Sequence, residues 1–286
     1  GLFIRFVFTG EMECYILTKV LNNNVVIARR HKKQYVLTGK GIGFNYSKGE
    51  KIPNDKVENV FVKQENAIGD NYDKILNTVE KSIIGISEEV ISFWEKVLNV
   101  KLNEAIHVSL PDHISFAIKR LKEGIDIKNP FLSEFIVLYP KEYEAARKAL
   151  EMINTRLKVH LPKDEIGFLC LHIKAASSNE NLVDSIKYAE KIGEVMNFIF
   201  LILKKEIDKD SLQYARTLTH INFMIQRVKE GKTVKNYLLD SIKKELYNEY
   251  NIAIKVALKI ENLFNISVPE DELGYIALHL SRLKNV

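Results

Sequence analysis

The sequence has only two cysteines, Cys14 and Cys170, so it offers neither a disulfide framework nor a CxxC metal pair. No apolar run reaches the roughly 18–20 residues of a membrane-spanning helix. Both absences lead us to expect a cytoplasmic protein that does not insert into a membrane. Apolar residues make up 46% and charged residues 28% of the 286 residues. This composition fits a folded chain of two or three compact domains without a disordered tail.

The first eleven residues, GLFIRFVFTGE, are apolar but lack the basic segment and the small-residue cleavage site of a signal peptide. Met12 then resembles a natural start. We therefore expect residues 1–11 to be an added leader or the product of a misassigned upstream start. Their alternative role would be an extra edge strand.

The excess of positive charge is confined to one short segment. Residues 12–66 hold ten lysines and arginines against five acidic residues, whereas residues 67–286 hold 31 of each sign. Such asymmetry favours a polyanionic partner at the N-terminal segment. The alternative is an ordinary solvated basic surface.

Residues 14–63 read as short strands separated by turns, which predicts a small antiparallel sheet. The expected strands are 15–21, 25–28, 34–38 and 57–62. Asn22-Asn23-Asn24 suits a tight hairpin turn because asparagine tolerates the left-handed conformation, and Gly39-Lys40-Gly41 ends the third strand. Roughly 50 residues of sheet give a thin core, so we expect dimerisation to help stabilise it.

From Asn71 onward the apolar residues recur three and four apart, as in amphipathic helices. The clearest stretches are 73–98, 109–123, 141–157 and 164–175. Pro162 and Pro269 each precede an acidic turn, which predicts a helix start just after each proline.

An internal repeat organises this helical region. DHISFAIKRLKEG aligns with THINFMIQRVKEG, and LPKDEIGFLCLHI aligns with VPEDELGYIALHL, both at an offset of 107 residues. Chance does not hold one register through two motifs so far apart, so the segment is duplicated, with a boundary near residues 177–179. The sequence predicts a multidomain chain with a small antiparallel β domain followed by two tandem all-α helical-bundle domains.

Four of the seven histidines occupy equivalent positions in the two copies: His113, His172, His220 and His279. Each copy also places an arginine seven residues after the first histidine and a glutamate seven before the second, namely Arg120, Arg227, Glu165 and Glu272. An arginine fork beside an imidazole suits a phosphoryl group on the histidine. Metal ligation is the alternative, although two histidines and one glutamate are barely enough ligands.

The N-terminal segment carries residues suited to nucleic acid. The amides of Asn22, Asn23 and Asn24 can pair with base edges. Gly39 and Gly41 allow a phosphate backbone to approach Lys40, and Phe44 can stack on an unpaired base. Each of these residues also has an ordinary structural reading as a turn or core residue. RNA fits better than DNA because no helix-turn-helix precedes the repeats.

These motifs resemble the BglG/SacY family of bacterial transcriptional antiterminators, and most closely its glucose-type members. The resemblance covers residues 14–286 and is carried by KVLNNNVVIA, LTGKGIGF, LPDHISFAIKR, NPFLSEFIVLYPKEYEAA and the paired PxDExGxxxLH segments. It implies a co-antiterminator domain at 12–66 that forms a homodimer and binds an RNA hairpin in the leader of sugar-phosphotransferase (PTS) genes. Binding would prevent terminator formation.

The family pattern assigns RNA contacts to seven positions: Lys19, Asn22, Asn24, Gly39, Lys40, Gly41 and Phe44. Many members have arginine at the position of Lys40, and a lysine cannot make the bidentate contact. No cofactor and no catalytic residue are implied.

The repeats resemble PTS-regulation domains (PRDs), PRD1 at 71–178 and PRD2 at 179–286. The resemblance makes His113 and His172 targets of a sugar-specific enzyme II, here glucose-specific. When the sugar is absent, enzyme II would phosphorylate these histidines and switch the protein off. His220 and His279 would be targets of the phosphocarrier HPr. Asp112 beside His113 is a supporting residue whose counterpart in the second copy is Thr219.

Two other functions remain open from the residues alone. One is an all-α metal-dependent hydrolase with an accessory β domain, which a bound stoichiometric transition metal would favour. The other is a PRD-containing DNA-binding activator, which preference for duplex DNA over an RNA hairpin would favour.

Overall fold

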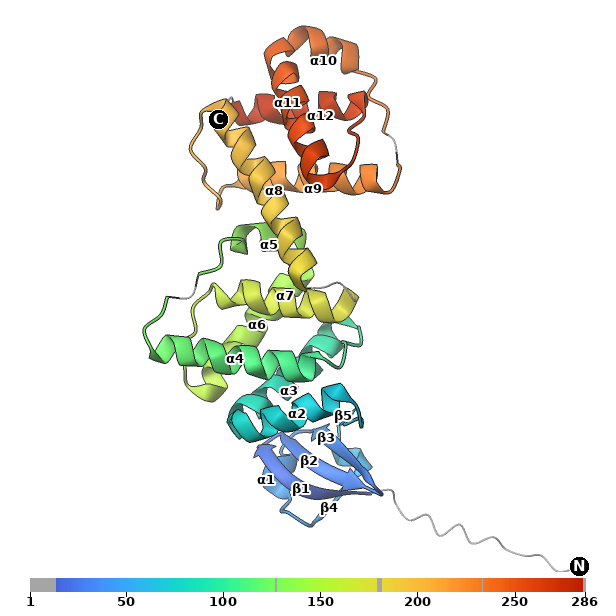
Figure 1. Cartoon of the computed structure of the whole chain (residues 1–286), viewed down its shortest axis with the longest axis vertical. Helices are drawn as coiled ribbons and strands as arrows, with labels where there is room; N and C mark the ends of the chain where they lie inside the picture. The colour runs from blue at the N-terminus through green and yellow to red at the C-terminus, as the bar shows by residue number, and fades with distance from the viewer. Residues whose placement is uncertain (1–13, 127, 179–181, 233, 285–286) are drawn as a thin grey trace, which may run out of the picture. The chain divides into compact units, whose positions relative to one another are not determined.

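The computed structural model describes residues 14–126, 128–178, 182–232 and 234–284. Residues 1–11, expected to be a leader, lie outside these ranges. The described chain forms two compact units (Figure 1). Of the described residues, the first unit contains those up to 128 together with 145–178, and the second contains 129–144 and those from 182 onward.

The N-terminal part of the first unit is a five-stranded antiparallel sheet of order β4-β1-β2-β3-β5. Its strands are β1 (Cys14–Asn22), β2 (Val25–Arg30), β3 (Lys33–Thr38), β4 (Lys51–Pro53) and β5 (Asn59–Val62). The four predicted strands are confirmed. The short β4, a 3₁₀ turn at Asn54–Lys56 and the one-turn helix α1 (Ile42–Asn45) were not predicted.

The turn between β1 and β2 is tight, as expected, but its backbone differs from the prediction. Asn22 pairs with Val25 across the hairpin, and none of the described residues Asn22–Asn24 has a positive φ. Instead the side-chain Oδ1 of Asn22 accepts a hydrogen bond from the backbone N of Asn24 at 2.9 Å. This turn is therefore closed by the asparagine side chain rather than by a left-handed residue.

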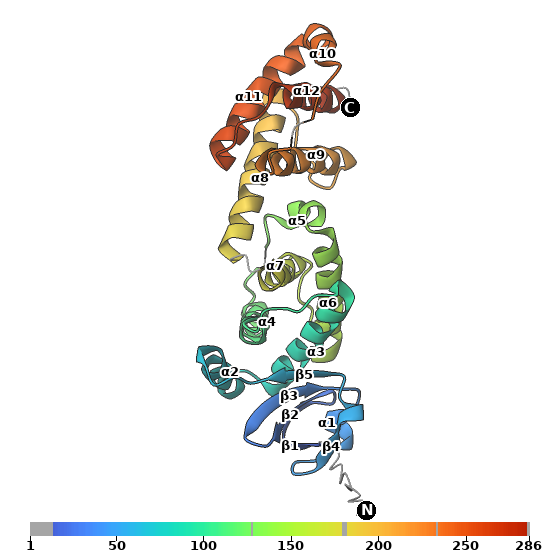
Figure 2. The ribbon, with the colours of Figure 1, turned by 90° about the vertical axis from the view of Figure 1, so that its right-hand side faces the viewer.

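The sheet is buried on both faces by the same chain. One face packs with α1 in a cluster that includes Leu17, Val26, Leu37 and Ile42. The other face packs against α2 (Ala67–Thr78) and α3 (Lys81–Leu98), as Figure 2 shows. The thin core expected of an isolated sheet is thus completed by these two helices.

The remaining helices of the chain are α4 (Ile106–Lys122), α5 (Leu132–Leu138), α6 (Pro140–Leu157), α7 (Glu165–Ser178), α8 (Leu182–Leu203), α9 (Leu212–Lys229), α10 (Leu239–Glu245), α11 (Tyr247–Phe264) and α12 (Glu270–Lys284). Helices at all four predicted stretches are confirmed, although 73–98 is divided between α2 and α3. The helix starts after Pro162 and Pro269 are confirmed by α7 and α12. No helix of the described ranges is long and apolar enough to cross a membrane.

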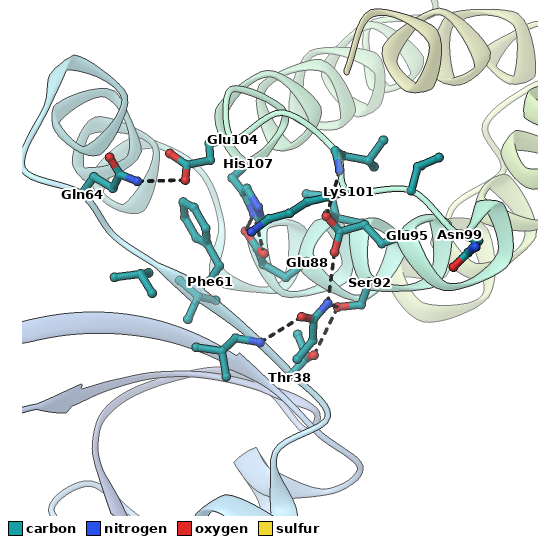
Figure 3. Close-up of a pocket in the computed structure, with 17 residues that line it drawn as sticks. Thr38, Phe61, Gln64, Glu88, Ser92, Glu95, Asn99, Lys101, Glu104 and His107 are labelled. Atoms are coloured by element: carbon teal, nitrogen blue, oxygen red, sulfur yellow. Dashed lines mark hydrogen bonds and ion pairs between the residues drawn. The ribbon is translucent and has the colours of Figure 1, made fainter. Parts of the chain in front are cut away.

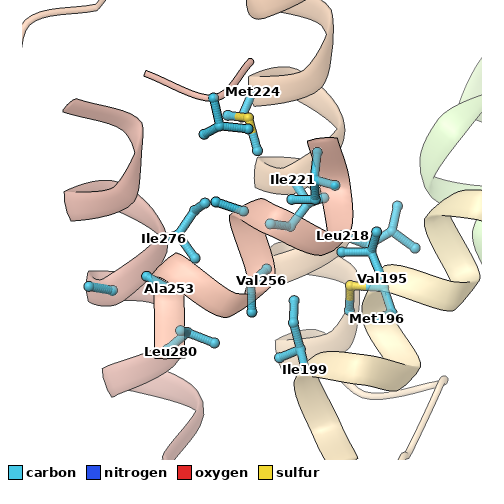
Figure 4. Close-up of a cluster of buried hydrophobic side chains, with 14 of the residues drawn as sticks. Val195, Met196, Ile199, Leu218, Ile221, Met224, Ala253, Val256, Ile276 and Leu280 are labelled. Carbon is cyan, nitrogen blue, oxygen red and sulfur yellow. The ribbon is translucent and has the colours of Figure 1, made fainter. Parts of the chain in front are cut away.

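The 107-residue repeat is visible in the helices, since α5 and α6 correspond residue by residue to α10 and α11. The packing of the two short helices nevertheless differs. Helix α10 packs against α11 and α12, whereas α5 packs against α8 and α9 in the second unit. The second unit is organised around one apolar cluster, which draws Val195, Leu218, Val256 and Ile276 from α8, α9, α11 and α12 (Figure 4).

Candidate functional site

In each repeat the two histidines come from different helices and meet. His113 on α4 and His172 on α7 have ring centroids 4.9 Å apart with the planes at 51°. His220 on α9 and His279 on α12 are stacked, with centroids 3.8 Å apart and planes at 24°. Sequence spacing placed equivalent histidines in each copy, and the fold brings each pair into contact.

The glutamate of the first pair binds a histidine. Nε2 of His113 lies 2.7 Å from Oε2 of Glu165, whose side chain is only 2% exposed. The guanidinium of Arg120 is farther away, with Nη2 at 3.7 Å from Oε1 of Glu165. Both Oε1 of Glu165 and Nε of Arg120 are buried without a hydrogen-bond partner. This carboxylate is therefore committed to the imidazole.

The glutamate of the second pair binds the arginine instead. Nε and Nη2 of Arg227 donate to Oε1 and Oε2 of Glu272 at 3.1 and 2.9 Å, a bidentate pair. His220, His279, Arg227 and Glu272 all line one cavity of about 300 Å³. The same three residue types thus adopt two arrangements, in which the carboxylate is bound by either the histidine or the arginine.

Burial favours the neutral form of three of these histidines, His172, His220 and His279. Burial, with a further contribution from His113, lowers the pKa of His172 to about 3. Burial, followed by His220 and Arg282, lowers the pKa of His279 to about 4, and the pKa of His220 is also lowered, mainly by burial. A neutral imidazole has a free nitrogen lone pair at pH 7, as a phosphoryl acceptor requires.

The position beside the first histidine differs between the copies. Asp112 is exposed on α4, whereas its counterpart Thr219 turns back and donates from Oγ1 to the backbone O of Ala215. Across the described residues, no three histidine, cysteine, aspartate or glutamate side chains are grouped so that they could hold a metal ion.

The predicted RNA-contact residues are brought together at one end of the sheet. Oδ1 of Asn24 accepts a hydrogen bond from the backbone N of Gly41 at 2.8 Å, and the backbone O of Asn24 accepts one from Gly39. Lys40 and Phe44 are exposed, Phe44 at 79%. Lys19 lies three residues before Asn22 on β1.

Both glycines have structural reasons to be glycine. A Cβ on Gly39 would lie 2.3 Å from the backbone O of Lys56, and Gly41 has a φ of +72°. Their conformations shape the loop around Lys40. Glu89 of α3 also touches this site through both asparagine amides. Sequence reasoning missed this contact because Glu89 is 65 and 67 residues away along the chain and belongs to no motif.

A second polar cluster joins the sheet to the helices of the first unit (Figure 3). The ring of His107 on α4 stacks on Phe61 of β5, with centroids 3.7 Å apart, and its Nδ1 lies 2.8 Å from Oε2 of Glu88. Thr38 of β3 is hydrogen-bonded to Ser92 of α3 at 3.2 Å. These contacts surround a cavity of about 630 Å³ between the sheet and α3.

The N-terminal sheet and the two helical repeats each match a known protein family. The PRD domain family matches residues 88–176 and 193–283, and the CAT RNA binding domain family matches residues 15–69. Transcription antiterminator LicT of Bacillus subtilis (strain 168) is 33% identical over 271 residues, covering 93% of this chain and 98% of LicT. Protein GlcT of Staphylococcus saprophyticus is 38% identical over 279 residues, covering 94% of this chain and 97% of GlcT.

Among solved structures, a crystal structure of GlcT CAT-PRDI is 42% identical in sequence. It covers 58% of this chain and 99% of its own chain, with a TM-score of 0.49.

Proposed function

Because the chain belongs to the family of RNA-binding transcriptional antiterminators that carry a CAT domain and regulatory PRDs, we propose that it binds an RNA hairpin in the leader of sugar-PTS genes and prevents terminator formation. Members of this family are regulators that bind RNA, so neither the metal-dependent hydrolase nor the DNA-binding activator is retained. The observation that carries the regulatory part is the pair of histidines in each PRD, set beside a glutamate and an arginine.

The RNA site is proposed at the Asn22–Asn24 turn and the Gly39–Gly41 loop. Lys19 and Lys40 supply positive charge, the asparagine amides supply hydrogen bonds, and Phe44 supplies an exposed ring for stacking. We further propose a CAT domain at 12–66, PRD1 at 71–178, PRD2 at 179–286, and a homodimer that acts in the cytoplasm.

We propose the phosphoryl donors from the family pattern. We assign His113 and His172 to a sugar-specific enzyme II, glucose-specific since several relatives are GlcT proteins. His220 and His279 are assigned to the phosphocarrier HPr. Asp112 is a supporting residue of the first pair only, since threonine stands in its place in the second.

Phosphorylation needs a nitrogen with a free lone pair. In PRD1, Glu165 engages Nε2 of His113, which leaves Nδ1 as the nitrogen that the carboxylate does not hold. The imidazole lone pair forms the new N–P bond while the bond between phosphorus and the donor atom breaks with its electron pair. The phosphoryl group adds about −1.5 to −2 charges.

In PRD2, a phosphoryl group on a histidine would lie beside Glu272 and Arg227, which are already paired with each other. The new phosphate repels Glu272 and competes for the fork of Arg227, since arginine binds phosphate in the same bidentate manner. The helices that carry these residues, α9 and α12, then repack.

The enzyme II assignment is tested with an antitermination reporter in the native host. The variant His113→Ala/His172→Ala should give antitermination that no longer needs the sugar, whereas His160→Ala, an exposed histidine with no repeat counterpart, should behave as wild type. Sugar dependence retained in the double variant would defeat the assignment. A gel shift with the leader hairpin against duplex DNA of the same sequence tests the nucleic-acid preference separately.

A further inference from the structure

We propose that Glu89, on α3 of PRD1, occupies an anion-binding site of the CAT domain that RNA also needs. RNA can therefore bind Asn22 and Asn24 only after α3 moves away. This inference rests on the RNA contacts proposed above. It adds a residue of the regulatory domain, Glu89, as a direct competitor of RNA.

The Glu89 carboxylate is shared evenly between the two asparagines. Nδ2 of Asn22 donates to Oε2 at 2.8 Å and Nδ2 of Asn24 donates to Oε1 at 2.7 Å. Arg156 of α6 donates to the same two oxygens at 3.2 and 3.0 Å. The Glu89 side chain is only 11% exposed. RNA cannot reach either amide NH₂ while the carboxylate is in place.

The asparagine amides are fixed in the orientation that an anion requires. Oδ1 of Asn22 accepts from the backbone N of Asn24, and Oδ1 of Asn24 accepts from the backbone N of Gly41. Each NH₂ group is therefore turned outward as a donor. Two adjacent donors match the two oxygens of a carboxylate, and equally the two non-bridging oxygens of an RNA phosphate.

Lysines flank the asparagines, as expected for a nucleic-acid site. Lys40 and Lys96 line a cavity of about 360 Å³ together with Asn24, Glu58 and Glu89. Within the N-terminal segment, basic residues outnumber acidic ones two to one. A carboxylate supplied by another domain thus fills a site whose charge suits a polyanion.

The close approach of α3 depends on Gly85, one helical turn before Glu89. A Cβ at this position would lie 2.6 Å from Nδ2 and 2.7 Å from Cγ of Asn22. Next to it, Ile84 of α3 packs in one buried cluster with Leu21 and Val25 of the sheet. A methyl group on Gly85 would therefore disturb the closed arrangement without altering any charge.

The test measures the affinity of the full-length protein for its leader RNA hairpin at one fixed salt concentration. Glu89→Gln keeps the shape but loses the charge and one of the two acceptor oxygens, and Gly85→Ala pushes α3 off Asn22. If closed and open arrangements compete, the apparent Kd is the intrinsic Kd divided by the open fraction. Loss of one charge-assisted hydrogen bond should then tighten RNA binding about tenfold.

The matched control is Glu58→Gln. Glu58 is an exposed carboxylate that lines the same cavity beside Lys40. Glu58→Gln therefore removes one negative charge near the RNA, as Glu89→Gln does. Equal tightening by Glu58→Gln and Glu89→Gln, with no tightening by Gly85→Ala, would overturn the proposal and leave simple charge repulsion. Thermal unfolding of each variant confirms that it is folded.

The RNA-contact assignment itself is checked by Asn22→Ala. If this variant binds RNA as well as wild type, the assignment of Asn22 is wrong. If it binds weakly while Glu89→Gln and Gly85→Ala bind as wild type does, the RNA site stands and the competition by Glu89 is refuted. Tightening by both α3 variants together with weakening by Asn22→Ala supports the proposal.

Discussion

Arg120 and Arg227 occupy equivalent positions in the two repeats but bind their glutamates differently, so one substitution should have two different effects. Arg227→Ala removes both hydrogen bonds to Glu272, a carboxylate that is 2% exposed. Arg120→Ala removes a guanidinium 3.7 Å from a carboxylate that keeps its 2.7 Å bond to His113. The first change leaves a buried charge unpaired and the second does not.

The expected magnitudes follow from burial. Removing one partner of a buried ion pair costs roughly 3–5 kcal/mol. The Arg227 side chain is 34% exposed, so solvent screening reduces this to about 2–3 kcal/mol for Arg227→Ala. Arg120→Ala should cost less than about 1 kcal/mol, because the pair is long and the carboxylate stays bound.

The chain provides its own probe for the measurement. Its single tryptophan, Trp94, is fully buried in the first unit and donates to the backbone O of Ala145. In urea, tryptophan fluorescence reports the first unit and far-UV circular dichroism reports both. Arg227→Ala should lower the circular dichroism midpoint and leave the fluorescence midpoint unchanged. Equal destabilisation by both variants would refute the reasoning.

Three further outcomes are expected. Burial lowers the folded-state pKa of His172 to about 3 and of His279 to about 4, so the unfolded chain takes up protons first as pH falls below about 6.5. The melting temperature should therefore fall between pH 7 and pH 5. A His172→Asn/His279→Asn variant should show a flatter dependence of melting temperature on pH. Lys209→Met should lower the free energy of unfolding by about 1–2 kcal/mol, because the fully buried Glu134 loses the ammonium that donates to it at 2.8 Å, and an unchanged urea midpoint would contradict this. Phe44→Ala, at a ring that is 79% exposed, should change stability by less than about 0.5 kcal/mol while weakening RNA hairpin binding roughly fivefold or more, as filter binding can measure.

Much of the fold was predictable because its strands and helices are long enough to show a period. Strand β4 and helix α1 have three and four residues, which is too short for either periodicity to appear. The break between α2 and α3 was missed because neither Val79 nor Glu80 is a helix breaker. Residues of this kind carry no local signal, and tertiary packing decides their conformation.

The candidate sites were predictable only as sets of residues. The repeat identified the histidines and their arginine and glutamate companions, but the same side chains form a Glu165–His113 bond in one copy and a Glu272–Arg227 bond in the other. Which partner the carboxylate binds depends on the positions of the helices, which a sequence does not encode locally. The contact of Glu89 with the asparagines likewise arises from the packing of distant segments.

The placement of α5 has a consequence for how this duplicated chain can be divided. Its Phe135 is fully buried and its Glu134 receives hydrogen bonds from Tyr214 and Lys209, all within the second unit. A cut at the sequence boundary near residue 178 would leave the C-terminal fragment without this helix. Tyr214 and Lys209 would then lose their shared acceptor, Glu134. The two copies are therefore not interchangeable cassettes: exchanging one PRD for that of a relative requires moving residues 129–144 together with the second repeat.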